Sequence, residues 1–319
     1  MRAPQNSALP HAAPAVRLAP RARTVSRRTA TARLAYGLVL PSLALIGVLE
    51  LYPILYSMWL TAQDVNLDIG GIGTEYIGLG NWTQMLHDAT LPFIVWTTVS
   101  FTGLVVLASL LIGLAIALLL NQDFHGRGFC RLVLLVPWAI PAVVSGRIWG
   151  LIFNAGFGIL NTLLRALGLV ETPIQWLTDP RLAINAVAFA QIWTNVPLVA
   201  LFLLAALQTI PQELYQAARV DGASAWGCFW HVTLPSIRTV GLILVVLTTI
   251  SSFKVFDLIY ILTNGYADTM VWYFNVFIQS FKNLNFGYGA TLAYALFLVI
   301  LGLTVLYFRL FPLRLEHER

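Results

Sequence analysis

A few polar and aromatic side chains interrupt strongly apolar stretches of this chain, where they could line a path for a polar ligand. Gln191, Trp193 and Asn195 lie within five residues of one another in such a stretch. Amides and aromatic faces together suit a ligand rich in hydroxyl groups, such as a sugar, and residues at i and i+4 share a helix face. Helix–helix hydrogen bonding is the alternative role for these groups. Tyr260 and Tyr288 are weaker candidates for the same path.

Four ionisable residues also fall inside apolar stretches: Glu50, Arg147, Lys254 and Asp257. Charged side chains are costly in a membrane and usually face a cavity or a partner. Lys254 and Asp257 are three residues apart, so on one helix they would share a face and either neutralise each other or line the path. Arg147 either extends to the outer surface or pairs with Glu50 if their helices meet.

The sequence motifs of common enzyme classes are missing. The chain has no G-x-x-x-x-G-K-[ST], so it cannot hydrolyse ATP through a P-loop of its own, and it lacks H-E-x-x-H, G-x-S-x-G and C-x-x-C. Its two cysteines, Cys130 and Cys228, have no metal-ligand spacing. We therefore expect no catalytic residue, no metal site and no cofactor in this chain.

The composition places the elements that must position these residues in a membrane. Hydrophobic residues make up 58% of the 319 residues and charged residues only 10%, against about a quarter charged in soluble domains. The apolar runs are continuous rather than alternating, which argues against a β-barrel. Prolines inside them do not exclude helices, because neighbouring helices can satisfy the freed backbone groups. We predict an all-α transmembrane fold, a six-helix bundle with spans at about 34–60, 93–120, 132–153, 182–206, 237–262 and 290–310.

The distribution of Lys and Arg predicts the orientation of the spans. Most of the basic residues lie in the N-terminal tail, in the connections 121–131 and 211–236, and at the C-terminus, and basic residues favour the cytoplasmic side. We expect a disordered cytoplasmic tail over 1–33, a membrane domain over 34–310 and a cytoplasmic tail over 311–319. The basic residues are not interleaved with aromatic residues on a soluble face, which argues against nucleic acid as a partner.

The cytoplasmic connection 211–236 has the features of a compact helical element that docks another protein. Asp221-Gly222 ends one short helix, and Leu234-Pro235 ends a second one. The second helix carries three aromatic residues at i, i+3 and i+4, hence on one face: Trp226, Phe229 and Trp230. Small residues allow a partner to come close, although an ordinary helical loop is the alternative. The residues expected at this docking surface are Glu213, Gln216, Ala217, Ala218, Asp221, Gly222, Ala223, Leu234 and Pro235.

This segment resembles the EAA loop of ABC importer permeases, whose pattern is E-A-A, three residues, Gly, nine residues, Ile, one residue and Leu-Pro. The spacing here matches throughout, at Gln216-Ala217-Ala218, Gly222, Val232 and Leu234-Pro235. In the family, the glutamate of the pattern is thought to pair with a basic group on the ATPase subunit. Because Gln216 cannot form an ion pair, we expect a contact that is supported differently, with help from Glu213 one turn earlier.

Further segments extend the resemblance to the carbohydrate-uptake branch of these permeases, over about residues 34–310. They are Tyr52-Pro53, Ile77 to Trp82, Gly158 to Leu163, Gln208 to Pro211, Phe256-Asp257 and Leu262 to Gly265. The chain departs from the family pattern where Asn264-Gly265-Tyr266 stands in place of Gly-Gly-Pro.

The resemblance implies a multi-pass permease subunit of an ATP-driven importer in a bacterial cytoplasmic (inner) membrane. The partners that it implies are a second permease subunit, two ATPase subunits that bind ATP and Mg, and an extracytoplasmic solute-binding protein. The solute would be a sugar, with a di- or oligosaccharide favoured. ATP-driven closure of the ATPase pair would move the coupling loop 211–236 and let the spans open to either side in turn.

Three other readings remain at this point. An ABC permease for a glycerol phosphate or another polar solute would use Arg147 or Lys254 to hold an anion. A secondary transporter driven by ion gradients would need inverted internal repeats, which the sequence does not show, and it would leave the spacing from Gly222 to Pro235 unexplained. A membrane enzyme is opposed by the missing catalytic residues.

Overall fold

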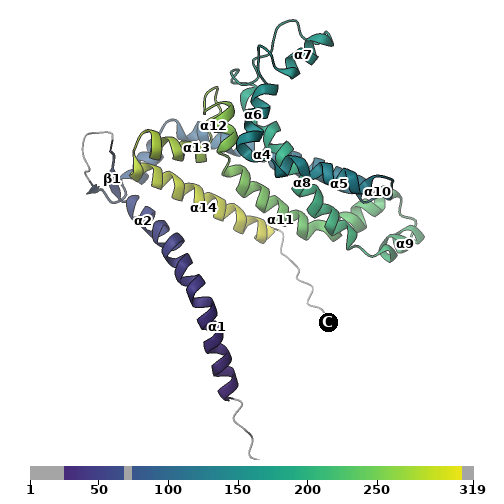
Figure 1. Ribbon diagram of the computed structural model, residues 1–319, viewed down its shortest axis with the longest axis horizontal. Helices are drawn as coiled ribbons and strands as arrows, with labels where there is room; N and C mark the ends of the chain where they lie inside the picture. The colour runs from purple at the N-terminus through teal and green to yellow at the C-terminus, as the bar shows by residue number, and fades with distance from the viewer. Residues whose placement is uncertain (1–24, 68–73, 311–319) are drawn as a thin grey trace, which may run out of the picture. The chain divides into compact units, whose positions relative to one another are not determined.

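The computed structural model describes residues 25–67 and 74–310 and is helical almost throughout (Figure 1). It divides into two compact units, Met1–Tyr56 and Ser57–Arg319. In the described part of the chain, five helices are long and apolar enough to cross a membrane, or six spans if a bent helix pair counts as one. The predicted all-α transmembrane fold is therefore confirmed.

The described part of the first unit, from Val25 onward, is one long helical segment. Its elements are α1 (Val25–Ile46), the π-helical turn η1 (Gly47–Leu51) and the start of α2 (Tyr52–Leu60), which continues into the second unit. The candidate span Leu34–Leu60 coincides with the predicted span. The helix begins nine residues earlier, at Val25, within the tail that we predict to be disordered, because Ala and Arg there favour helix. The predicted tails at 1–24 and 311–319 lie outside the described residues.

The second unit is built around long helices joined by short ones. In chain order it contains β1 (Gln63–Val65), β2 (Thr74–Tyr76), α3 (Gly80–His87), α4 (Leu91–Leu120), α5 (Arg127–Ala139), α6 (Ala142–Ile152), α7 (Ile159–Ala166), α8 (Ala183–Gln208), α9 (Gln212–Val220), α10 (Ala225–Cys228), η2 (Phe229–Thr233), α11 (Leu234–Phe253), α12 (Asp257–Leu262), α13 (Trp272–Phe277), η3 (Ile278–Lys282) and α14 (Phe286–Leu310). The two short strands pair antiparallel, with Gln63 opposite Tyr76.

The centre of this unit is the packing of α4, α8 and α11. Gly113 on α4 lies against α8 so closely that an added Cβ would be 2.6 Å from Cγ1 of Val199. Small residues allow this approach of two membrane helices, where packing replaces the hydrophobic effect as the driving force. Ala117 and Ala200 are completely buried in the same contact, which Leu203 and Leu244 complete.

The predicted third span, 132–153, is not one helix. α5 and α6 meet at an angle of 95° across a short break. Ile140 has an extended backbone (φ −77°, ψ 127°) because the residue before a proline, here Pro141, is pushed out of the helical region. Pro137, by contrast, is accommodated inside α5. The break leaves free backbone groups, and such groups are tolerated at membrane depth only where protein or a cavity covers them.

The predicted fifth span, 237–262, is also broken. The candidate span runs over Ala225–Leu262, but α11 ends at Phe253 and α12 begins at Asp257. Nor does Leu234-Pro235 end a helix as predicted, because the π-helical turn η2 passes directly into α11. Leu234 N–H bonds to Phe229 O, five residues back, and this wider turn is a usual device for keeping helix geometry around an irregular position.

The connection between α6 and α8 is held together by the buried side chain of Asn161. Its Nδ2 donates to Ile174 O (2.9 Å), and its Oδ1 accepts from Ile174 N (3.1 Å) and from Trp176 Nε1 (3.1 Å). We expect Asn161→Ala to loosen residues 171–178 by about 2–4 kcal/mol, because several buried groups lose their partners at once. Hydrogen exchange of the Ile174 amide measures this. Thr162→Ala, at the exposed neighbouring position, is the control, and equal protection in both variants would contradict the assignment.

Candidate functional site

The predicted docking loop folds as two short helices around a glycine turn. Gly222 has a left-handed backbone (φ +85°), and Ala223 N bonds to Ala218 O (2.9 Å) while Gly222 N bonds to Arg219 O (3.0 Å). These are the two hydrogen bonds of a Schellman motif, which ends a helix with glycine in the left-handed region. Ser224 then caps α10 by accepting from Gly227 N (3.2 Å). The sequence-predicted break at Asp221-Gly222 is confirmed.

Most of the predicted docking residues are exposed on this element. Glu213, Gln216, Ala217, Asp221 and Gly222 are exposed, and in the described structure no atom beyond the two chain neighbours lies within 4 Å of a Cβ built on Gly222. Val220 beside them is 88% exposed. Valine side chains are usually buried, so this exposure is typical of a surface that a partner protein covers. The two half-buried alanines, Ala218 and Ala223, line the inner side of the turn.

The second helix carries the aromatic cluster that the sequence predicts. The ring of Trp226 stacks on Phe229 (5.5 Å between centroids) and lies edge-on to Trp230 (5.7 Å). Both tryptophans are exposed. An exposed apolar group of this kind marks a surface that contacts protein or membrane.

The two short helices are joined by a contact that sequence reasoning missed. Tyr215 Oη on α9 is 3.0 Å from Thr233 Oγ1 in η2. Together with Cys228 and Leu118 at the end of α4, these side chains border a hollow of about 470 Å³. The motif spacing contains no signal for this bond, because it depends on how the helices fold back. Leu234 and Pro235 lie beyond it, in the first turn of α11, and Leu234 is half-buried rather than part of the exposed surface.

The predicted polar path is brought together only in part. Gln191 Nε2 donates to Asn195 Oδ1 (3.2 Å), as the i, i+4 spacing predicts. The other end of the Asn195 amide, Nδ2, is buried and has no hydrogen-bond partner in the described structure. Trp193 lies elsewhere: its ring packs edge-on against Trp149 (5.6 Å) in the core.

Asn195 borders a hollow of about 380 Å³ that lies at the break between α5 and α6. We call it the polar hollow; its lining residues are Trp138, Ile140, Ala142, Thr194, Asn195, Leu198, Val199, Leu244, Leu247, Thr248 and Ser251. Amide, hydroxyl and indole groups therefore meet beside an irregular backbone. Thr248 and Ser251 were missed, although their i, i+3 spacing in an apolar helix is a usable signal.

Lys254 and Asp257 do not share a helix face, and this prediction is wrong. Lys254 is the residue at which α11 ends (φ −96°, ψ 16°), and Asp257 is the first residue of α12. Both side chains are exposed, and no ion pair joins them in the described structure. Tyr260 is exposed on α12 and stacks on Phe256 (5.5 Å).

Tyr288 is placed in the core. It is 3% exposed, and its Oη donates to Asp88 Oδ2 (2.7 Å), which ties the start of α14 to the connection before α4. Partial burial raises the pKa of the Asp88 carboxyl group, but hydrogen bonds from Thr90 and Tyr288 outweigh this effect and hold the pKa below its usual value. Tyr288 does not line the polar hollow, and its bond to Asp88 gives it a structural role. We therefore do not propose Tyr288 as a residue of the path.

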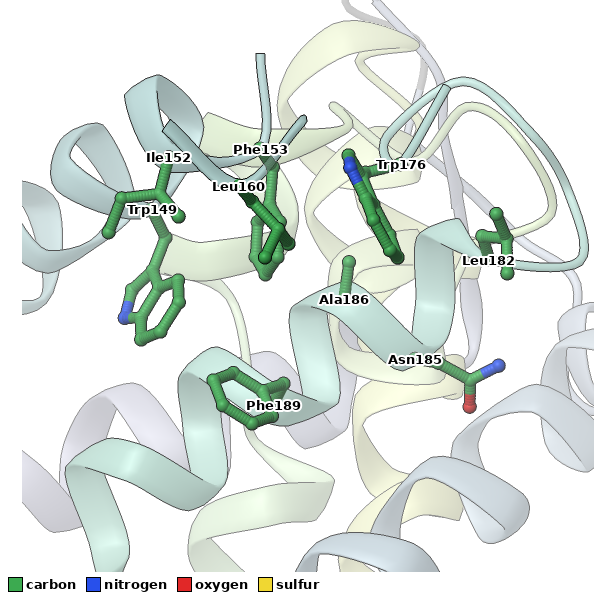
Figure 2. Close-up of a pocket in the computed structure, with 9 residues that line it drawn as sticks. All are labelled: Trp149, Ile152, Phe153, Leu160, Trp176, Leu182, Asn185, Ala186 and Phe189. Atoms are coloured by element: carbon green, nitrogen blue, oxygen red, sulfur yellow. The ribbon is translucent and has the colours of Figure 1, made fainter. Parts of the chain in front are cut away.

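A further hollow, of about 470 Å³, lies between α6, α7 and α8 and is almost wholly apolar (Figure 2). The rings of Trp149, Phe153, Trp176 and Phe189 surround it. Its amide, that of Asn185, lies at the edge and donates to the backbone oxygen four residues earlier (3.0 Å). This hollow has no hydroxyl group in its lining, which distinguishes it from the polar hollow, and its buried donor without a partner in the described structure is the indole Nε1 of Trp149.

Comparison with known proteins connects this geometry to a family. Residues 109–312 match the family described as "Binding-protein-dependent transport system inner membrane component". The chain is 34% identical over 280 residues to the trehalose/maltose transport system permease protein MalF of Thermococcus litoralis, covering 87% of this chain and 93% of that protein. It is also 34% identical over 279 residues to the sulfoquinovosyl glycerol transport system permease protein SmoG of Agrobacterium fabrum, with coverage of 87% and 90%.

Among solved structures, the fold resembles a chain of a bacterial alginate ABC transporter in complex with an alginate pentasaccharide-bound periplasmic protein. The TM-score is 0.78 at 19% sequence identity, and the match covers 89% of this chain and 95% of the other. The family match covers more than half of the sequence and includes the docking loop, both broken spans and the polar hollow. The chain therefore belongs to the binding-protein-dependent ABC transporter permeases, as a multi-pass inner-membrane component that is not itself catalytic and has no cofactor site of its own.

Proposed function

We propose that this permease transports a sugar, with a di- or oligosaccharide favoured, and that the polar hollow lies on its path. The observation that carries the proposal is the buried Nδ2 of Asn195, which has no hydrogen-bond partner in the described structure and belongs to a residue that lines the hollow of about 380 Å³. Buried polar groups are almost always paired, so an unpaired donor beside a hollow indicates a ligand. Trehalose and maltose, named for the MalF relative, are disaccharides rich in hydroxyl acceptors.

Two further features support the polar hollow as a path. Ligand sites have mostly apolar walls with a few placed polar groups, and here Thr194, Thr248 and Ser251 supply hydroxyls beside the Trp138 ring. The break at Ile140 adds backbone groups that have left the helix. Of the path residues predicted from sequence, Gln191 orients Asn195, whereas Trp193, Lys254, Asp257 and Tyr260 do not line this hollow.

We assign the loop 211–236 to the ATPase contact on the cytoplasmic side, with both termini on the same side. The exposed turn at Gly222, with small and apolar neighbours, suits a partner that fits closely. A second permease subunit would complete the path, two ATPase subunits would bind ATP and Mg, and a solute-binding protein would deliver the sugar from outside. ATP-driven movement of the loop would rock α11, which follows the loop through η2 without a break.

An ion-driven secondary transporter is the rival from another class. Secondary transporters also use broken spans, and the described part of this chain has two, at Ile140 and at Lys254. Membership of the ABC permease family and the spacing of the docking loop favour ATP-driven transport. The test is uptake of labelled trehalose and maltose by proteoliposomes that contain the complete transporter. We expect uptake that requires ATP inside; uptake driven by an ion gradient alone would contradict the proposal.

The exchange of the family's glutamate for Gln216 provides a direct test of how the loop docks. Gln216 is exposed and makes no ion pair in the described structure, so we infer that shape carries more of the contact than this position does. Gln216→Glu is expected to change ATP-dependent uptake less than about fivefold, since an exposed ion pair contributes about 0–1 kcal/mol. A tenfold gain would instead show that the missing charge limits coupling. Glu213→Gln is the matched variant one turn earlier.

A further inference from the structure

Helix α6 also borders a third hollow, whose lining includes the arginine Arg147. This hollow has a volume of about 350 Å³, which falls within the range of small-molecule sites. We call it the arginine hollow; it is lined by Gly146, Arg147, Gly150, Leu151, Leu177, Ile261 and Leu262. Arg147 is the one charged residue among these, and the other walls are apolar.

Within the described residues of the second unit, the guanidinium of Arg147 has no anionic partner. The ion pair that the described residues contain joins Arg127 to Asp123, at the start of α5. Asp257 begins α12, the helix that packs on α6, yet it forms no ion pair with Arg147. Lys254, just before it, also has no ion pair within the described residues of this unit. An ionisable residue inside a membrane segment usually has a partner or a functional role.

Two glycines allow α6 and α12 to pack closely beside this hollow. Gly146 and Gly150 lie one turn apart on α6 and face α12: an added Cβ at Gly146 would be 3.1 Å from Cγ2 of Ile261, and one at Gly150 would be 3.6 Å from Leu262. The close packing leaves the long Arg147 side chain exposed beside apolar walls. Because Arg147 is exposed, a ligand can reach its guanidinium, whose planar set of N–H donors matches the oxygens of a carboxylate or a phosphate.

The arginine hollow lies along the same helix as the polar hollow. Ala142 in the first turn of α6 borders the polar hollow, and Arg147 follows about 8 Å further along the helix axis. We propose that Arg147 binds an oxyanion group, such as a carboxylate or a phosphate, that the transported solute carries. This inference rests on the proposed transport of a sugar and adds to it a preference for sugars that bear an acidic group.

The test is binding to the complex of this chain with its second permease and ATPase subunits in lipid nanodiscs, without the solute-binding protein. The probes are labelled maltose and the same disaccharide with its terminal hydroxymethyl group oxidised to a carboxylate. The wild-type complex is expected to bind the acidic sugar about tenfold more tightly, as a charge-assisted contact provides. Arg147→Gln should remove this preference without weakening the binding of maltose, and Arg147→Lys should keep part of the preference.

Arg165→Gln is the matched control, because Arg165 is exposed on α7 and lies outside the arginine hollow. Equal binding of both sugars by the wild-type complex, or a preference that survives Arg147→Gln, overturns the inference alone. Loss of the second permease from the Arg147→Gln complex also overturns it, since the oxyanion would then belong to the partner. Binding of neither sugar contradicts the proposed sugar class and the inference together.

Discussion

Gly222→Asp is expected to reduce both co-purification of the ATPase subunits and ATP-dependent uptake by about a hundredfold. Gly222 has a left-handed backbone (φ +85°), which costs a non-glycine residue roughly 1–2 kcal/mol. In the described structure, no atom beyond its two chain neighbours lies within 4 Å of a Cβ at this position, so the larger effect must come from the partner. A new charge buried in that contact without a counter-ion costs several kcal/mol, and about 2.7 kcal/mol already corresponds to a hundredfold.

The chain offers a matched control for this variant. Gly168 at the end of α7 has φ +68° and open space around it, and it ends its helix through the same pair of bonds, from Leu169 N to Leu164 O and from Gly168 N to Arg165 O. Gly168→Asp therefore carries the same backbone cost on an element that we expect on the opposite side of the membrane. It should leave ATPase co-purification unchanged. An equal loss in both variants would assign the effect to misfolding rather than docking.

Asn195→Ala is expected to raise the sugar concentration that half-maximally stimulates the ATPase by about thirtyfold. The Nδ2 group is buried and unpaired in the described structure, so its partner on our account is a hydroxyl oxygen of the sugar. Removal of the donor leaves that group unsatisfied, at a cost of about 2 kcal/mol, which corresponds to about thirtyfold. The measurement uses the complete transporter with its solute-binding protein in proteoliposomes, over a series of sugar concentrations.

Asn185→Ala on the same helix is the control. Its amide donates to Arg181 O (3.0 Å) at the edge of the aromatic hollow, and this bond is exposed, so its loss should change the half-maximal concentration less than twofold. Asn195→Asp tests the polarity of the site, since it keeps the shape and the acceptor for Gln191 but removes the donor. A thirtyfold effect of Asn185→Ala, or none of Asn195→Ala, would remove the polar hollow from the path.

The sequence predicts those parts of the fold that depend on local patterns. Long apolar runs predict the spans, and the first one coincides with Leu34–Leu60. Asp221-Gly222 predicts the helix end because only glycine takes φ +85° at low cost. The i, i+4 spacing likewise predicts the bond between Gln191 and Asn195. Each of these patterns involves residues that are close together in the sequence, so no tertiary contact is needed to interpret it.

The breaks inside the spans are harder to predict, because hydropathy does not register them. Pro137 and Pro141 are four residues apart and have different outcomes: α5 includes the first and ends before the second. The break at Lys254 has no proline at all, and α12 there packs on α6, so tertiary contacts decide where the helix stops. This explains why the prediction that Lys254 and Asp257 share a helix face was wrong. It also explains why the sequence predicted Asn195 in the polar hollow but not Thr248 and Ser251.

Accessibility of the docking loop tests the central claim most directly. In a chain with Cys130→Ser and Cys228→Ser, the variant Ala217→Cys places a thiol on the exposed surface of α9, and Leu167→Cys places one after α7. With a membrane-impermeant thiol reagent, we predict labelling of Leu167→Cys in intact cells. We predict labelling of Ala217→Cys only in inverted vesicles, with protection when the ATPase subunits are bound. Labelling of Ala217→Cys in intact cells, or equal labelling with and without the ATPase subunits, would contradict the account.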